Sequence, residues 1–268
     1  MNIDALIVSD LDNTLLNTDH RLDPLTIETF QEMERRGAVL AIASGRHYRD
    51  IRAVREQLGV DAYIISTNGA HLYDRRDRLV SERLLPATLV HDLTLLDKPD
   101  SVRLNVYTGS GWLIDAPDQR LLAFHHSTGF VYEVDPALRG KARDDVGKVL
   151  FIGDPSELAP IEREVRERFG GQAHVTYSLP DSLEVMARDV NKGRALGVLL
   201  EILGMTPAQC VAFGDNLNDV EMLELAEGAC VMENANPLLF EALPHAKVIG
   251  HHDQAGVARE LRSRFALD

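Results

Sequence analysis

The chain has 268 residues, 45% hydrophobic and 26% charged, a composition typical of a globular protein with one large domain or two unequal ones. Its formal net charge is −14 and its 28 Lys and Arg residues are scattered, which argues against a nucleic-acid partner because phosphate-backbone binding needs clustered cations. With two cysteines, no signal-like N-terminus and no apolar run of about 18 residues, we expect a cytoplasmic protein without disulfide bonds or membrane spans.

Short aliphatic and β-branched runs alternate with amphipathic stretches at both ends of the chain, which is the pattern of a parallel sheet covered by helices. The runs expected to form buried strands are residues 5–9, 38–43, 62–66, 210–213, 229–232 and 247–249. The stretches expected to form helices are residues 24–36, 48–58, 192–203, 218–225, 237–243 and 254–265. Their order predicts a doubly wound α/β fold.

The middle of the chain has a different pattern, that of an α+β unit. Strands expected at residues 102–107 and 112–114 flank Thr108-Gly109-Ser110-Gly111, a turn sequence typical of a hairpin. Further strands are expected at residues 130–134, 149–152, 174–177 and 182–186, and helices at 117–127 and 156–169. We therefore predict that residues 83–187 form an α+β domain inserted into a parallel-sheet domain made of residues 1–82 and 188–268.

Two acidic residues, Asp10 and Asp12, follow the first predicted strand. They lie at the carboxyl edge of the sheet, where ligands bind in open α/β folds, and their spacing in extended chain directs them to the same side. One carboxylate could attack phosphorus while the other acts as general acid and base. The alternative is that these residues only form a turn and cap the following segment.

Two further segments bring phosphate-binding groups toward the same edge. Ser44 and Gly45 follow the second predicted strand, just before a helix, where a hydroxyl and free backbone N–H groups can cradle a phosphate. Lys192 opens the helix after the inserted domain, where a cation is unfavourable unless an anion lies nearby. An ordinary helix cap at Ser44 and a solvated Lys192 are the alternatives.

Asp215 and Asp219 follow the next strand of the parallel sheet and are either oxygen ligands of a cation or, in one case, a helix cap. Together with Asp10 and Asp12 they would place four mutually repelling carboxylates in one crevice. A divalent cation removes this repulsion, and Mg²⁺ suits a site of oxygen ligands completed by a phosphate. The cation would also attract an anionic substrate to an acidic protein.

In chain order, the segments DLDNTLL, ASGR, NKG and GDNLND resemble the four motifs of the haloacid dehalogenase superfamily of phosphohydrolases. The resemblance covers essentially the whole chain, and the inserted domain is similar to the large α/β cap of the Cof-type branch. It implies a Mg²⁺-dependent phosphatase that is a monomer or homodimer. The implied substrates are small phosphate esters, such as phosphosugars or pyridoxal phosphate, with pyrophosphate cleavage of a thiamin precursor as a variant.

The resemblance also implies roles for individual residues. Asp10 is expected to become an aspartyl-phosphate, with Asp12 as general acid and base, while Ser44 and Lys192 hold the phosphoryl oxygens. The expected Mg²⁺ ligands are Asp10, Asp12 through its backbone carbonyl, Asp215, and Asp219 through water. The residues expected at the substrate are Asn13, Gly45, Arg46, Asn68, Gly69 and Asn218. Asn13 replaces a glycine common in the family, and asparagine tolerates positive φ well.

Three alternatives remain open. A signalling receiver domain also uses an acidic cluster, a phospho-accepting aspartate and a lysine, but here the acceptor would lie on the first strand and a large domain is inserted. A phosphomutase of the same superfamily would release an isomeric ester rather than phosphate. A dinucleotide-binding enzyme is disfavoured because no G-x-G-x-x-G follows the first strand.

A few residues have no motif around them. Trp112 is expected to pack in a core, whereas the pairs His125-His126 and His251-His252 are expected on the solvated surface.

Overall fold

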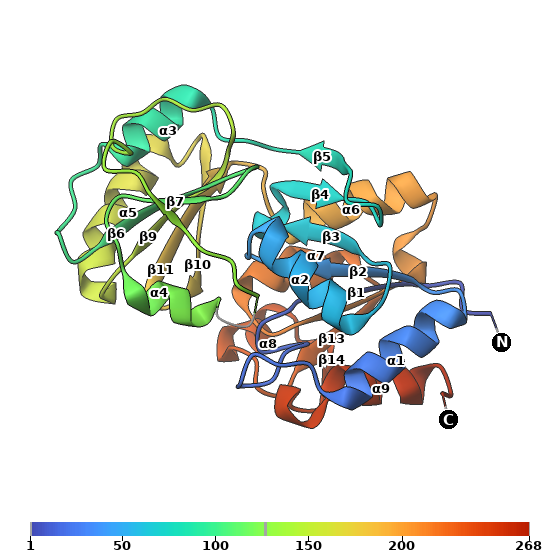
Figure 1. Cartoon of the computed structure of the whole chain (residues 1–268). Helices are drawn as coiled ribbons and strands as arrows, with labels where there is room; N and C mark the ends of the chain where they lie inside the picture. Colours follow the sequence, from blue (N-terminus) through green and yellow to red (C-terminus); the bar gives the residue numbers. More distant parts are fainter. Residues whose placement is uncertain (1, 126–127, 268) are drawn as a thin grey trace. The chain divides into compact units, whose positions relative to one another are not determined.

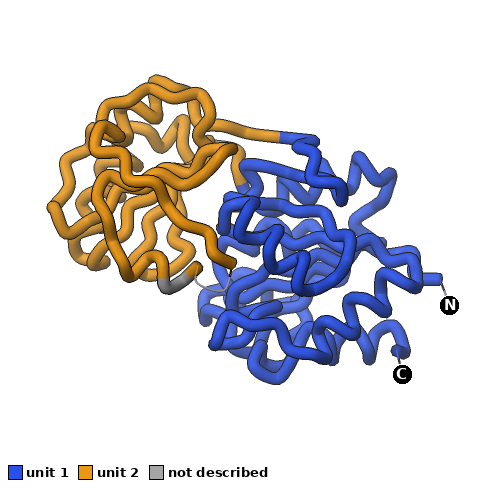
Figure 2. The backbone as a smooth tube through the Cα atoms, viewed as in Figure 1, with its two compact units in different colours: residues 1–81, 191–268 blue, residues 82–190 orange. Residues whose placement is uncertain are grey.

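The computed structural model describes residues 2–125 and 128–267, and the chain divides into two compact units (Figure 2). Unit 1 consists of residues 1–81 and 191–268, and unit 2 of residues 82–190. Among the described residues, no helix combines the length and the apolar character needed to cross a membrane.

Unit 1 is built on one large sheet. Its strands are β1 (Leu6–Ser9), β2 (Val39–Ala43), β3 (Tyr63–Ser66), β4 (His71–Tyr73), β5 (Leu79–Glu82), β12 (Cys210–Gly214), β13 (Gly228–Met232) and β14 (Lys247–Ile249). Within the described residues their order is β14-β13-β12-β1-β2-β3-β4-β5. Every neighbouring pair from β14 to β3 is parallel, whereas β3 and β4 are antiparallel.

Helices cover both faces of this sheet (Figure 1). On one face pack α1 (Pro24–Arg35), α2 (Tyr48–Leu58) and α9 (Gly256–Arg264), and on the other α6 (Lys192–Leu203), α7 (Val220–Leu225) and α8 (Pro237–Ala242). Because both faces are buried, the central strands are almost continuously apolar instead of alternating. In β1, for example, Ile7 packs into the first of these cores and Val8 into the second. The predicted doubly wound α/β fold is confirmed.

Unit 2 has a sheet of its own. Its strands are β6 (Arg103–Thr108), β7 (Trp112–Ile114), β8 (Glu133–Val134), β9 (Val146–Ile152), β10 (Ala173–Leu179) and β11 (Ser182–Ala187), in the order β10-β11-β9-β6-β7-β8. Among the described residues, neighbouring strands of this sheet are antiparallel, except that β7 and β8 are parallel. Helices α3 (Ala87–Thr94) and α5 (Pro155–Phe169) supply apolar side chains to one core of this unit, and α4 (Gln119–Phe124) follows β7.

Several predicted elements differ from the observed ones. Elements β4, β5 and α3 were not predicted, and the strand expected at 130–134 forms only at Glu133–Val134. The helix expected at 117–127 is the shorter α4, and residues 126–127 lie outside the described part of the chain. The helices expected at 218–225 and 254–265 are each preceded by a 3₁₀ turn, η3 (Leu217–Asp219) and η4 (His252–Gln254).

The burial of the unassigned aromatic residues confirms one expectation and corrects another. Trp112 is buried, and its indole N–H donates to Asn105 Oδ1 at 2.8 Å. His125 and His252 are also buried, so the expectation of a solvated surface is wrong for both. The His125 ring packs edge-on against Trp112, and His252 is hydrogen-bonded to the backbone of Leu16. His126 lies outside the described residues, and His251 is partly exposed.

The close contact between α6 and α7 gives a test of this packing. A Cβ added at Gly193 would lie 2.3 Å from the carbonyl oxygen of Glu221, whereas one added at Gly197 would meet Leu225 at an ordinary 3.8 Å. We expect Gly193→Ala to lower the free energy of unfolding by about 2 kcal/mol or more. Gly197→Ala, on the same helix, is the control and should raise it by up to about 1 kcal/mol. Urea titration measures both, and equal effects would contradict the packing described.

Candidate active site

The carboxyl end of β1 lies between the ends of β2 and β12. Ser9 is level with Ile42 of β2 and Phe213 of β12, and the N–H of Asp10 continues the ladder by donating to the Phe213 carbonyl at 2.9 Å. The polar segments that follow these strands therefore start at one edge of the sheet. This parallel register brings Asp10 close to Asp215, although the two are far apart in sequence.

Lys192 links three of these segments. Its Nζ donates to Asp10 Oδ1 at 2.6 Å and to Asp219 Oδ1 at 2.7 Å, and its side chain is completely buried. The Asn191 side chain caps α6 by accepting from the Arg194 N–H at 2.7 Å, which sets Lys192 as the first helical residue. Burial alone would lower the pKa of Lys192, but Asp10 and Asp219 hold it above its usual value. Lys192 is therefore a buried cation held between the carboxyl groups of Asp10 and Asp219.

Asp219 is held by its own loop. Its Oδ2 accepts the backbone N–H groups of Asp215 and Asn216 at 3.0 and 3.1 Å, while Oδ1 accepts from Lys192. A Cβ on Gly214 would lie 2.6 Å from Asp219 Cγ, so this turn needs glycine to approach the carboxylate. The fully buried Asp219 thus organises the loop after β12 and positions Asp215.

Asp10, Asp215 and Asp219 form a compact acidic group that can hold a cation. Each offers a carboxylate oxygen, and the three oxygens lie within 4.8 Å of one another. Thr14 Oγ1 donates to Asp215 Oδ1 at 2.9 Å. Burial raises the pKa of Asp10 well above its ordinary value, with Lys192 opposing and Asp219 adding to the shift. Burial and then Asp219 raise the pKa of Asp215 to about 7. The oxygen-only donor set and the uncompensated negative charge fit Mg²⁺.

Asp12 has different partners. Its carboxylate accepts from both Nε and Nη2 of Arg46, at 2.8 and 2.5 Å, and His20 Nδ1 lies 3.5 Å from its Oδ1. Burial alone would raise the pKa of Asp12, but the Arg46 guanidinium holds it well below its usual range. The Asp12 side chain is not part of the acidic group around Asp10.

Arg46 also binds Asp50, a site residue that the sequence reasoning missed. Arg46 Nη1 lies 3.1 Å from Asp50 Oδ2, and Asp50 on α2 is 0% exposed. The guanidinium therefore bridges the loop after β1 to helix α2. The i, i+4 spacing of Arg46 and Asp50 was the available signal, but such pairs are common on exposed helix faces.

Ser44 is linked to two of the residues predicted at the substrate, Arg46 and Asn68, by hydrogen bonds to their backbone N–H groups. Ser44 Oγ accepts the N–H of Arg46 at 3.1 Å, and the Ser44 carbonyl accepts the N–H of Asn68 at 3.0 Å. Asn68 Oδ1 accepts from Asn218 Nδ2 at 3.0 Å. Within the described residues, Ser44 forms no hydrogen bond with Asp10 or Lys192.

Two of the predicted positions, Asn13 and Gly69, have positive φ, and a third, Gly45, has little space for a side chain. Gly69 has φ +100°, and a Cβ there would lie 2.3 Å from the carbonyl oxygen of Asn191, so only glycine fits. A Cβ on Gly45 would lie 3.1 Å from Asn68 Oδ1. Asn13 has φ +54° and its carbonyl accepts from Asn234 Nδ2 at 2.8 Å, so asparagine does adopt positive φ at the position where glycine is common.

Comparisons with known proteins agree with this geometry. The sequence model of the family described as haloacid dehalogenase-like hydrolase matches residues 7–261. A putative phosphatase of Haemophilus influenzae is 38% identical over 98% of this chain and 97% of its own length. An HMP-PP phosphatase of Cronobacter sakazakii is 38% identical over 94% and 92%. The crystal structure of a haloacid dehalogenase-like hydrolase from Bacteroides thetaiotaomicron superposes with a TM-score of 0.87 at 27% identity, covering 97% of this chain and 99% of that one.

The buried pair of Arg46 and Asp50 predicts a stability effect. Asp50→Ala removes one partner of a buried guanidinium, and we expect the free energy of unfolding to fall by about 3 kcal/mol. Glu56→Ala, on the same helix, removes a half-exposed partner of Arg52 and should change it by less than about 1 kcal/mol. Urea unfolding of both variants gives the comparison. Equal losses in the two variants would contradict the larger contribution to stability that we expect of the buried pair.

The raised pKa of Asp215 predicts how stability changes with pH in EDTA. Folded Asp215 binds its proton more tightly than the unfolded chain does, so the stability it contributes is complete below its ordinary pKa and is lost as pH rises through about 7. We expect the free energy of unfolding to fall from about pH 4, near the ordinary pKa of an aspartate, to about pH 7, the raised pKa of folded Asp215. Asp215→Asn should make this slope shallower, and excess Mg²⁺ should do the same. An unchanged slope in the variant would contradict the assignment.

Proposed function

The chain belongs to the haloacid dehalogenase-like hydrolases, and on this premise we propose that it is a Mg²⁺-dependent phosphatase that hydrolyses small phosphate esters through an aspartyl-phosphate at Asp10. The phosphatase class follows from the family and from the names of the relatives. The observation that supports the residue roles is the buried chain Asp10–Lys192–Asp219, with Asp215 beside it. Residues 83–187 are proposed to be the inserted cap domain of the family.

The acidic group is the proposed metal site. The Asp10 and Asp215 carboxylates and the Asp12 carbonyl would hold Mg²⁺, which supplies positive charge against the phosphoryl oxygens. Asp219 is proposed to support the site indirectly, since Lys192 and two backbone N–H groups already occupy its oxygens.

Asp10 is the proposed nucleophile. Lys192 holds its Oδ1, which orients the carboxylate and counters charge on the transferred group. An Asp10 oxygen attacks phosphorus and the bond from phosphorus to the leaving oxygen breaks, while Asp12 gives that oxygen a proton. A water then attacks the aspartyl-phosphate, giving its proton to Asp12 and releasing phosphate and Asp10. Ser44 and Asn218 are proposed to bind the phosphoryl group.

Arg46 must change partners for Asp12 to act. Its guanidinium engages both Asp12 oxygens, and so Asp12 can give or take a proton only after this two-point contact opens. An anionic group on the substrate is a suitable alternative partner, since guanidinium groups bind phosphate in the same two-point manner. This fits the predicted place of Arg46 at the substrate. The other residues proposed at the substrate lie in the segments after β1, β2 and β3: Asn13, Gly45, Asn68 and Gly69.

The substrate is proposed to be a small phosphorylated metabolite. Phosphosugars and pyridoxal phosphate are candidates from the family resemblance. The relative named as an HMP-PP phosphatase adds HMP-PP as a candidate substrate. A phosphomutase would use the same nucleophile but return an isomeric ester, so products separate the two.

Phosphate release from a panel of small phosphate esters tests the proposal. With Mg²⁺ we expect turnover of at least one ester, and Asp10→Asn should lower kcat by on the order of 10⁴-fold or more because no nucleophile remains. Asp61→Asn removes an exposed carboxylate of the same unit and should leave turnover unchanged. EDTA should abolish activity and added Mg²⁺ should restore it. Activity that survives in Asp10→Asn would reject Asp10 as the nucleophile, and an isomeric phosphate ester without free phosphate would reject hydrolysis.

A further inference from the structure

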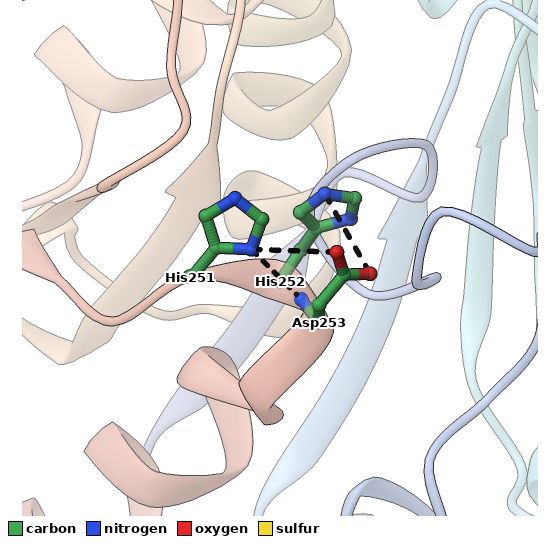
Figure 3. Close-up of side chains that lie close together, drawn as sticks. All are labelled: His251, His252 and Asp253. Atoms are coloured by element: carbon green, nitrogen blue, oxygen red, sulfur yellow. Dashed lines mark hydrogen bonds and ion pairs between the residues drawn. The ribbon is translucent and has the colours of Figure 1, made fainter.

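A second group of metal-ligating side chains lies just before α9, apart from the acidic group. Figure 3 shows the carboxylate of Asp253 beside the rings of His251 and His252. The distance from His251 Nδ1 to Asp253 Oδ2 is 3.7 Å, and from His252 Nε2 to Asp253 Oδ1 it is 3.9 Å. One ligand atom from each residue lies within 4.8 Å of the others. These separations are longer than hydrogen bonds and correspond to ion pairs if the rings are charged, so Asp253 faces both imidazoles.

The ring of His252 is fixed in the orientation of a metal ligand. It is buried, and its Nδ1 lies 2.9 Å from the carbonyl oxygen of Leu16. Because a carbonyl only accepts, Nδ1 carries the hydrogen, so in the neutral ring the lone pair is on Nε2, on the side of Asp253. Metal-binding histidines have the same arrangement, in which the second ring nitrogen donates to a backbone carbonyl.

Asp253 is held equally firmly. Its Oδ1 accepts the backbone N–H of Thr18 at 2.8 Å, and its Oδ2 accepts the Thr18 hydroxyl at 2.9 Å. Each carboxylate oxygen retains a further lone pair for a cation. His251, the third group, is about one-third exposed and accepts only a long hydrogen bond from the Asp253 N–H, at 3.2 Å.

We propose that His251, His252 and Asp253 bind one transition-metal ion of the Zn²⁺ class, with water completing the shell. Two imidazoles and one carboxylate suit Zn²⁺, Co²⁺ or Ni²⁺, whereas Mg²⁺ prefers oxygen ligands only. Tetrahedral ligands about 2.1 Å from the ion are roughly 3.4 Å apart, so a small movement of the partly exposed His251 toward Asp253 and His252 closes the site. His251 gives up its hydrogen bond to the Asp253 N–H when it binds.

The ion would tie the chain before α9 to the loop after β1. Asp253 is bonded to Thr18 and His252 to Leu16, both in that loop. The backbone N–H of His252 also donates to Asn234, whose side chain donates to the carbonyl of Asn13. The site therefore stabilises the segment that continues from Asp10 and Asp12, whatever reaction those residues carry out.

Metal titration of the full chain tests this assignment. Excess Mg²⁺ is present so that it occupies the acidic group. Under these conditions isothermal titration with ZnCl₂ should show one bound ion per chain, and Zn²⁺ should raise the Tm. Co²⁺ should give the visible absorption of a tetrahedral site with nitrogen ligands. His251→Gln, at the partly exposed ligand, and Asp253→Asn should each weaken Zn²⁺ binding at least about 10-fold. His245→Gln, at an exposed histidine elsewhere in the unit, should bind as the unaltered chain does.

The outcomes separate this site from the proposed active site. No Zn²⁺ binding in excess Mg²⁺, or binding that is unchanged in His251→Gln and Asp253→Asn, would overturn the proposal. Zn²⁺ binding that is lost in Asp215→Asn and retained in His251→Gln would do the same by assigning the ion to the acidic group. Because His251→Gln removes the hydrogen bond from the Asp253 N–H, urea unfolding without metal should show only a small loss of stability, and a chain that remains folded shows that lost binding is not lost folding.

Discussion

The completely buried ammonium of Lys192 is the interaction on which the site depends. It joins the end of β1 to the loop after β12 through Asp10 and Asp219, and it opens helix α6. Its single positive charge leaves two negative charges uncompensated when Asp10, Asp215 and Asp219 are all ionised. Burial first and the negative charge of Asp219 second raise the pKa of Asp215 to about 7, and the excess negative charge is what a divalent cation would neutralise. The same imbalance that costs stability without metal thus defines the proposed metal site.

Much of the fold and part of this site could be predicted because both follow from strand ends. Strands buried on both faces are continuous apolar runs, and the polar residues after them must meet at one edge of a parallel sheet. Elements without that signal were missed: β4 is only three residues long, and β5 is largely exposed. The convergence of Asp10, Lys192 and Asp215 could be predicted from the sheet topology alone. The hydrogen-bond partners of individual side chains could not be predicted in this way.

The arrangement of Asp12, Arg46 and Asp50 shows what sequence could not give. Alternation along an extended chain directs Asp10 and Asp12 to the same side, yet Asp12 pairs with Arg46 and lies outside the acidic group. Which of several nearby charges a carboxylate meets depends on side-chain rotamers and on burial, neither of which spacing encodes. His252 was misjudged for a related reason, because its burial follows from a bond to Leu16, more than two hundred residues away.

The loop after β1 connects the proposed phosphoryl-transfer site with the histidine cluster. Its first residues are Asp10 and Asp12, and Asn13 turns the chain with φ +54°. Thr14 then bonds to Asp215, while Leu16 and Thr18 bond to His252 and Asp253. One short segment is therefore fixed at successive points by two groups of ligands with different chemistry, oxygens alone at one and imidazoles with a carboxylate at the other. If both proposals hold, an ion at the histidine cluster would stabilise the same loop that carries Asp12, only a few residues of backbone away.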